Sequence, residues 1–309
     1  MRRYVLQRLA LMLLSIWVVV TLTFLMMHAV PGDPFTDPKL RPEIKELMMR
    51  KYGLDKPLWQ QYLVYWSNFL RGEWGSSLYN IGRDVEVMIR EGFPESFQVG
   101  IQALTWAVIA GIALGTVAAL NHNRTWDYVA MVIAVIGVSV PSFVVGVVLQ
   151  YLLGVKLRLF PIVWDGTFKG SILPSFALGL GTVAVMARMM RTQMLEVLGQ
   201  DYIRTARAKG LSDTEVVWRH GLRNAILPVL TILGPLFATI VTGTVVIETV
   251  FGIPGIGRYY VQSVFTDDYP LILGTTVFYF VFLIISNFLV DLSYGIVDPR
   301  IRVGSNGRR

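Results

Sequence analysis

The chain has 309 residues, of which 54% are hydrophobic and only 16% are charged. An ordinary soluble domain carries about 25% charged residues, so the composition excludes that class and indicates a membrane protein. The net charge is +7, but the placement of the charged residues argues against a nucleic-acid partner. Cysteine is absent, which excludes disulfides, thiolate metal sites and cysteine nucleophiles.

Six apolar segments follow one another along the chain, and each is long enough to cross a bilayer. The first has about 22 residues, a helix of roughly 33 Å, which exceeds the thickness of the hydrocarbon core. It is also longer than the apolar part of a signal peptide, so we expect an uncleaved anchor. The fourth segment shows the weakest pattern. The predicted spans are Leu9–Val30, Phe97–Leu120, Val129–Val155, Ile172–Met190, Ala225–Val250 and Leu271–Tyr294.

The distribution of Lys and Arg predicts the orientation of these spans. With a cytoplasmic N-terminus, the inside segments hold fifteen basic residues and the two short outside loops hold four. Short loops rich in Lys and Arg stay in the cytoplasm, so both termini are predicted to be cytoplasmic. The chain then divides into a tail with the first span (1–30), an external segment of short helices (31–96) and a transmembrane domain (97–309) with a cytoplasmic loop (191–224).

The cytoplasmic loop shows the pattern of a helix, a sharp turn and a second helix. An amphipathic helix is predicted from Met194 through Ala208, with basic residues beside its apolar face. Gly210 is typical of a helix stop, and Ser212 with Glu215 three residues later forms a capping box. A basic amphipathic helix either lies on anionic lipid or docks a partner, and the pattern leaves both alternatives open.

The same loop resembles that of a known family. Residues 201–211, DYIRTARAKGL, are similar to the EAA loop of ABC importer permeases, and specifically to the dipeptide/oligopeptide/nickel branch. Two positions of the general pattern differ, because Arg204 and Thr205 replace its acidic residue and first alanine; its Leu-Pro also comes later, at Leu227-Pro228. The resemblance extends over nearly the whole chain, through MRRYVLQRL at the start, Pro31–Phe35, Val140–Phe143, Val246–Gly257 and Val297–Ile301.

The resemblance implies an all-α polytopic protein with the six-helix fold of type I ABC importer permeases. The sequence is most similar to the B-type subunit of an oligopeptide importer, and the implied location is a bacterial or archaeal cytoplasmic membrane. The implied partners are a C-type permease, two cytoplasmic ATPases and an external peptide-binding lipoprotein or periplasmic protein; no cofactor is implied. Relatives carry dipeptides, glutathione or nickel chelates, which remain alternative substrates. The residues implied to couple the permease to the ATPases are Arg204, Thr205, Ala206, Arg207, Lys209, Gly210, Leu211 and Ser212.

A Gly- and Pro-rich segment follows the fifth predicted span. It lacks the Lys-Ser/Thr of a phosphate-binding loop, and no such loop occurs elsewhere in the sequence, so ATP hydrolysis must come from another chain. We expect a tight external loop that needs positive φ and closes the mouth of a pore. Glu248 either faces the pore or hydrogen-bonds this loop. The residues of this predicted outer gate are Glu248, Gly252, Pro254, Gly255 and Gly257.

Two prolines interrupt predicted spans, and a glycine pair marks a predicted helix contact. Pro141 and Pro235 remove backbone hydrogen bonds in the third and fifth spans, which predicts kinks that either move during gating or are static. Gly111 and Gly115, four residues apart in the second span, favour close helix packing inside the bundle.

No arrangement of residues indicates catalysis. His28, His122 and His220 lie far apart, and the motifs of metalloproteases and serine hydrolases are absent from the sequence. A proton-coupled carrier usually has a chain of intramembrane carboxylates, whereas only Glu248 and Asp291 lie near span ends. We therefore expect a permease subunit rather than an enzyme, with a membrane-embedded enzyme as the less favoured alternative.

Overall fold

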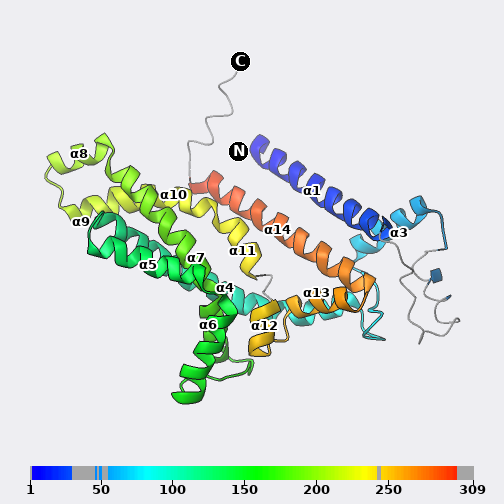
Figure 1. Ribbon diagram of the computed structural model, residues 1–309. Coiled ribbons are helices and arrows are strands. Elements are labelled where there is room, and N and C mark those ends of the chain that lie inside the picture. The colour runs from blue at the N-terminus through cyan, green and yellow to red at the C-terminus, as the bar shows by residue number, and fades with distance from the viewer. Residues whose placement is uncertain (1, 30–45, 47–48, 51–54, 242–244, 298–309) are drawn as a thin grey trace.

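The computed structural model describes residues 2–29, 46, 49–50, 55–241 and 245–297, and these residues are almost entirely helical (Figure 1). Their β-structure is limited to a bridge between Ser76 and Asp84. The predicted all-α class is confirmed. The elements are α1 (Arg2–Ala29), α3 (Leu58–Arg71), α4 (Val85–Leu120), α5 (Thr125–Ser139), α6 (Ser142–Leu149), the π-helical η1 (Gln150–Lys156), α7 (Phe168–Leu198), α8 (Asp201–Ala208), α9 (Asp213–Glu215), the π-helical η2 (Val216–Leu222), α10 (Arg223–Thr231), α11 (Leu233–Val241), α12 (Val245–Phe251), α13 (Ile256–Phe265) and α14 (Tyr269–Val297).

Four of the described helices, α1, α4, α7 and α14, are long and apolar enough to cross a membrane. Two further helix pairs pass the same test only as bent units, which brings the number of candidate spans to six if each pair counts as one. Among the four long helices, α7 is the least apolar, yet 67% of its most apolar window is buried in the protein. The fourth predicted span was weak because this helix faces other helices more than lipid.

The third predicted span is not a straight helix. Its two parts, α5 and α6 with η1, meet at an angle of 98°. Val140 has an extended backbone (φ −90°, ψ 122°) because the ring of Pro141 disfavours the helical conformation in the residue before it. The predicted interruption at Pro141 is therefore a complete break, after which α6 and η1 leave the bundle (Figure 1).

The fifth predicted span is bent by 53° between α10 and α11. The break is at Ile232, three residues before Pro235. Pro235 is the third residue of α11, where a backbone N–H would have no partner within the helix, so the proline fits the first turn at no hydrogen-bonding cost.

Close packing of α4 against α7 forms the centre of the bundle. A Cβ atom at Gly111 would collide with Cβ of Met186, and one at Gly115 would lie 2.5 Å from the carbonyl oxygen of Ala187. On α7, three methionines at or just beyond this helix interface are fully buried. They are Met186, Met190 and Met194. The predicted packing role of the glycine pair is confirmed.

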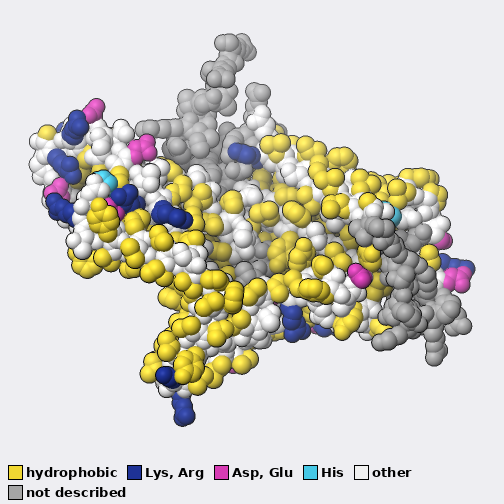
Figure 2. Space-filling view, viewed as in Figure 1, with side chains coloured by type: hydrophobic (Ala, Val, Ile, Leu, Met, Phe, Trp, Pro, Cys, Tyr) yellow, Lys and Arg dark blue, Asp and Glu magenta, His cyan; other side chains and the backbone are white. Residues whose placement is uncertain are grey.

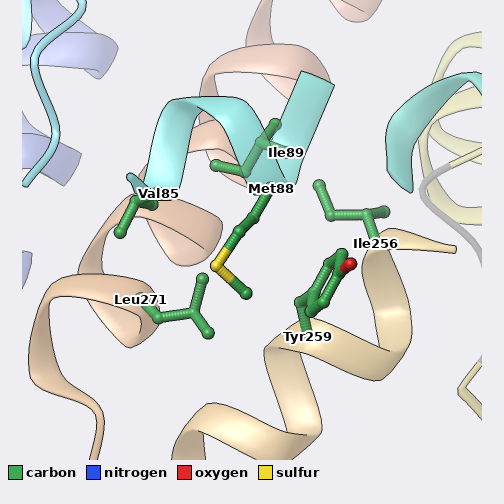
Figure 3. Close-up of a cluster of buried hydrophobic side chains, with 6 residues drawn as sticks. All are labelled: Val85, Met88, Ile89, Ile256, Tyr259 and Leu271. Carbon is green, nitrogen blue, oxygen red and sulfur yellow. The ribbon is translucent and has the colours of Figure 1, made fainter. Parts of the chain in front are cut away.

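The helix α4 begins at Val85, twelve residues before the predicted start of the second span. Its extension is held by an apolar cluster with α13 and the start of α14 (Figure 3). In this cluster the α4 side chains meet those of the α13–α14 hairpin, and all six residues are at most 7% exposed. The members are Val85, Met88 and Ile89 of α4, Ile256 and Tyr259 of α13, and Leu271 of α14.

Asp268, fully buried before α14, ties the same hairpin to the chain preceding α4. Its carboxylate accepts hydrogen bonds from the backbone N–H groups of Leu78 (3.1 Å), Tyr79 (3.2 Å) and Leu271 (3.3 Å), and from the hydroxyl of Ser77. These donors satisfy the buried charge, so the segment next to α4 is fixed to the bundle.

The surface has the distribution of a membrane protein. Figure 2 shows apolar side chains over much of the visible flank of the helices, whereas Lys and Arg gather at the end that carries α8 and α9 and at the free end of the α6–η1 arm. The predicted division of the chain at residues 30 and 96 remains a prediction.

Candidate coupling loop and external gate segment

The predicted helix from Met194 through Ala208 is wrong, because the structure divides it in two. Residues up to Leu198 are the last turns of α7, and Met194 is fully buried there. Gln200 has an extended backbone (φ −74°, ψ 150°) and turns the chain into the separate helix α8. The short helix α8 therefore stands at the end of the bundle (Figure 1).

The apolar face of α8 is covered by the loop itself. Ile203 and Ala206, at 0% and 6% exposure, pack against Val216 of η2, with Val197 and Leu211 at the edge of this small core. A helix that binds a lipid surface needs a free apolar face. The packing of Ile203 and Ala206 therefore argues against the lipid-surface alternative.

The outer face of α8 and the turn after it are polar and exposed. The predicted coupling residues on this face are Arg204, Thr205, Arg207, Lys209, Gly210 and Ser212. Arg204 and Arg207 form exposed ion pairs with Asp201 (3.5 Å) and Asp213 (3.3 Å). The structure thus brings the eight predicted residues together on one helix and turn, six on the exposed face, with Ala206 in the loop core and Leu211 at its edge.

The turn has the predicted geometry. Gly210 adopts φ +80°, and no heavy atom lies within 4 Å of a Cβ placed there, so conformation rather than space requires glycine. The hydroxyl of Ser212 accepts from the N–H of Glu215 (3.3 Å), and the N–H of Ser212 donates to the Glu215 carboxylate (3.1 Å). The capping box is confirmed, and hydrogen bonding from Ser212 lowers the pKa of Glu215.

An ion pair with a buried carboxylate, which the sequence pattern did not indicate, joins α7 to α5 near the loop. Arg191 donates from Nε to Oδ1 of Asp127 (2.6 Å) and from Nη2 to Oδ2 (2.7 Å). The Asp127 side chain is only 3% exposed and also accepts from the N–H of Asn123 (2.9 Å). His122 lies beside the pair, with Nδ1 3.5 Å from Oδ2. One signal was present, because Asp127 is the single acidic residue between Glu95 and Asp165.

At the other end of the bundle, Glu248 caps the first turn of α13. Its Oε1 accepts from the hydroxyl of Ser96 (2.6 Å) and its Oε2 from the N–H of Arg258 (3.1 Å). The Ser96 hydroxyl in turn accepts from the N–H of Ile256 (3.0 Å). Glu248 is 3% exposed, so of the two alternatives for this residue the structure has the hydrogen-bonded one.

The glycines of the gate segment serve two different purposes. Gly252 has φ +67°, as expected for a tight turn, and Pro254 is exposed. Gly255 does not have positive φ (−86°), which corrects the expectation for the loop as a whole. A Cβ at Gly255 would lie 2.5 Å from the hydroxyl of Ser96 and would collide with the Glu248 carboxyl, and one at Gly257 would lie 2.9 Å from Oε2 of Glu248. These two glycines make room for the buried carboxylate.

The start of the gate segment is also held by the α6–η1 arm. The side-chain amide of Gln150 donates to the carbonyl oxygens of Val250 (3.0 Å) and Ile162 (2.7 Å). The N–H of Trp164 donates to the carbonyl oxygen of Phe251 (2.8 Å). The segment therefore contacts α4 through Ser96 and the arm through Gln150.

Within the described residues, no group of three or more His, Asp or Glu side chains is placed to hold a metal ion. His28, His122 and His220 lie on α1, in the turn after α4 and in η2, respectively. The side chain of Asp291, the other acid near a span end, lies outside the described residues.

Comparison with known proteins decides the family. Residues 111–303 match the family described as the inner membrane component of binding-protein-dependent transport systems. The chain belongs to this family. Residues 1–82 match the N-terminal family of the same membrane components. The resemblance drawn from the motifs is confirmed, and the chain is a multi-pass membrane component of a transport system.

Full-length relatives are transport permeases. The chain is 45% identical to the dipeptide transport system permease protein DppB of Lactococcus lactis, over 98% of this chain and 100% of the relative. It is 45% identical to DppB of Bacillus subtilis, over 99% and 100%. It is 40% identical to the oligopeptide transport system permease protein OppB of Haemophilus influenzae, over 98% and 100%.

A solved structure shows the same fold over part of the chain. The crystal structure of an amino acid ABC transporter with histidines aligns with a TM-score of 0.52 at 17% identity, covering 66% of this chain and 92% of the other. The predicted permease fold is therefore confirmed for the aligned part.

Proposed function

We propose that the chain is the B-type, pore-forming permease subunit of an ATP-driven importer that translocates short peptides delivered by an external binding protein. The observation that carries the proposal is the 45% identity, over the full length, to two dipeptide permeases. Identity to the oligopeptide permease is lower, at 40%, which favours dipeptides over the longer peptides that the sequence motifs indicated. The chain itself performs no hydrolysis in this proposal.

The proposed partners follow from the two ends of the bundle. Two ATPases dock from the cytoplasm, one of them on the exposed face of α8, and a C-type permease completes the pore. Both termini are cytoplasmic, and the binding protein approaches the opposite side, where Glu248, Gly252, Pro254, Gly255 and Gly257 form the outer gate. The sequence contains no phosphate-binding loop for ATP, which supports a separate ATPase.

The coupling role of α8 follows from its rigidity. An ATPase shifts the permease between two states only through an element that it contacts differently in each state. The Ile203–Ala206–Val216 core makes α8 and η2 one unit, and the Arg191–Asp127 pair fixes the end of α7, from which the loop begins. A movement of the ATPase bound to α8 therefore also displaces α7 and α5.

Charge reversal on α8 tests this function. We expect Arg204→Glu and Lys209→Glu to leave the protein in the membrane but to reduce ATPase co-purification and peptide-stimulated ATP hydrolysis at least tenfold, because both residues lie on the exposed face. The control for ATPase binding is Lys169→Glu in the first turn of α7, at the opposite end from the loop, which is expected to co-purify with the ATPases as the wild-type protein does. Wild-type ATPase binding and stimulation in both α8 variants would overturn the docking proposal.

A further inference from the structure

The helix α3, which precedes α4 in the chain, has an apolar arc wider than the surface it packs against. Residues three, four and seven positions apart share one face of a helix. On this basis the polar residues of α3 occupy one side, and the remaining side carries aromatic and aliphatic residues in two groups. The polar side holds Gln60, Gln61, Ser67, Asn68 and Arg71; one apolar group holds Tyr62, Tyr65 and Phe69, and the other holds Trp59, Leu63, Trp66 and Leu70.

Tyr62 and Tyr65 of the first apolar group bind α3 to the end of α1, and Phe69 stacks on Trp74. The hydroxyls of Tyr62 and Thr21 are 2.7 Å apart. The ring of Phe24 lies 5.4 Å from that of Tyr62 and 5.5 Å from that of Tyr65, centroid to centroid. Near the polar side of α3, Gln61 contacts Nε2 of His28 at 2.8 Å. These contacts place α3 beside the last two turns of α1.

The second apolar group is largely without a partner in the described part of the chain. Trp59 is 63% exposed, Leu63 57% and Leu70 75%. These three residues lie within about 40° of one another around the helix. They form one continuous stripe along α3, which we call the outer stripe.

The position of α3 on α1 indicates what covers the outer stripe. The stretch of α1 that is long and apolar enough to cross a membrane is Val5–Met26, so the contacts at Thr21 and Phe24 lie near its end, where we expect hydrocarbon to give way to headgroups. Leu22 and Met26, in the same turns of α1, are 52% and 68% exposed, as expected for lipid-facing side chains. Figure 2 shows apolar side chains continuing from α1 to the end of the molecule where α3 lies.

The composition of α3 also fits the membrane interface. Tryptophan is enriched at this depth because its ring is apolar and its N–H is polar. The charges at the two ends of the helix sum to zero, so we expect apolar burial rather than attraction to anionic headgroups to hold it at the membrane. These charged residues are Asp55, Lys56, Arg71 and Glu73. We propose that α3 is an interfacial helix whose outer stripe is immersed in the phospholipid of the leaflet next to the end of α1. This proposal does not depend on the transported substrate.

The test uses the assembled transporter in liposomes and the absence of native cysteine. A single cysteine at Leu63 or Leu70 carries a small fluorophore, and Arg71→Cys on the polar side is the matched control. We expect a nitroxide near the headgroup end of the lipid chains to quench the Leu63→Cys and Leu70→Cys probes at least threefold more than the control. Iodide in water should quench the control more strongly.

Two results would overturn the proposal. If iodide quenched the two stripe probes as strongly as the Arg71→Cys probe, the outer stripe would face water. If neither quencher reached the stripe probes, a protein partner would cover the stripe; repeating the measurement without the external binding protein would then show whether that protein or the second permease is the partner. Changing the fraction of anionic lipid should leave the quenching unchanged.

Discussion

Two buried carboxylates hold opposite ends of the molecule, and each is satisfied by groups distant in the sequence. Glu248 accepts from Ser96 and from the first turn of α13, and Asp127 accepts two hydrogen bonds from Arg191. A buried carboxyl group is tolerated only when hydrogen-bond partners surround it. Each acid therefore fixes the relative positions of the helices that it joins. Glu248 joins α12 to α4 and α13, and Asp127 joins α5 to α7.

We predict that Glu248 acts through the gate segment rather than through substrate. Glu248→Ala leaves the Ser96 hydroxyl and the Arg258 N–H without their acceptor, which costs about 1–3 kcal/mol for a buried group. We expect a clear fall in the melting temperature of the purified protein. Glu248→Gln keeps one acceptor oxygen, so its melting temperature should fall less and peptide uptake should be retained. Loss of uptake by Glu248→Gln at unchanged melting temperature would instead assign the carboxylate to the substrate.

At the scale of elements, the Asp127–Arg191 pair joins α5 to α7. We expect Asp127→Ala to destabilise the protein by about 1–3 kcal/mol, less than a fully buried pair, because the Arg191 side chain is 24% exposed. ATP hydrolysis should also respond less to peptide, since α8 follows the end of α7. The exchange of both residues, Asp127→Arg with Arg191→Asp, should restore part of the loss. An exchange variant no better than the single variants would show that the pair does not act as a unit.

The sequence predicted those elements whose cause is local. The turn at Gly210 and the capping box of Ser212 and Glu215 depend on residues within one turn of each other, and both were found. The extension of α4 was missed because Val85–Ser96 contains charged residues, which end an apolar pattern but not a helix. The break between α7 and α8 was missed because apolar residues on both sides of Gly199 suggested one continuous helix face, although a glycine at the end of such a face is itself a stop signal.

Contacts between residues that are distant along the chain could not be predicted from the sequence. Ser96 and Glu248 are 152 positions apart and Asp127 and Arg191 are 64 apart. The glycine at position 255 looked like a conformational requirement, whereas it makes room for Glu248. Such a role appears only once the helices are packed.

At the scale of the whole molecule, the distribution of basic residues predicts the orientation in the membrane. A cysteine at Ser212 in the coupling loop should react with a membrane-impermeant maleimide only after the membrane is opened. The matched control is Ile81→Cys, which is 81% exposed before α4 and should react from outside in intact cells. Labelling of Ser212→Cys in intact cells would reverse the orientation.

We propose above all that the chain forms half of a peptide pore driven by separate ATPases. The most direct measurement is uptake of a radiolabelled dipeptide into proteoliposomes that contain the chain, its C-type partner and both ATPases, with the binding protein and ATP supplied on their proper sides. We expect uptake that needs every component and ceases when ATP is replaced by a non-hydrolysable analogue. Dipeptide accumulation by the chain alone, without ATPases, would contradict it.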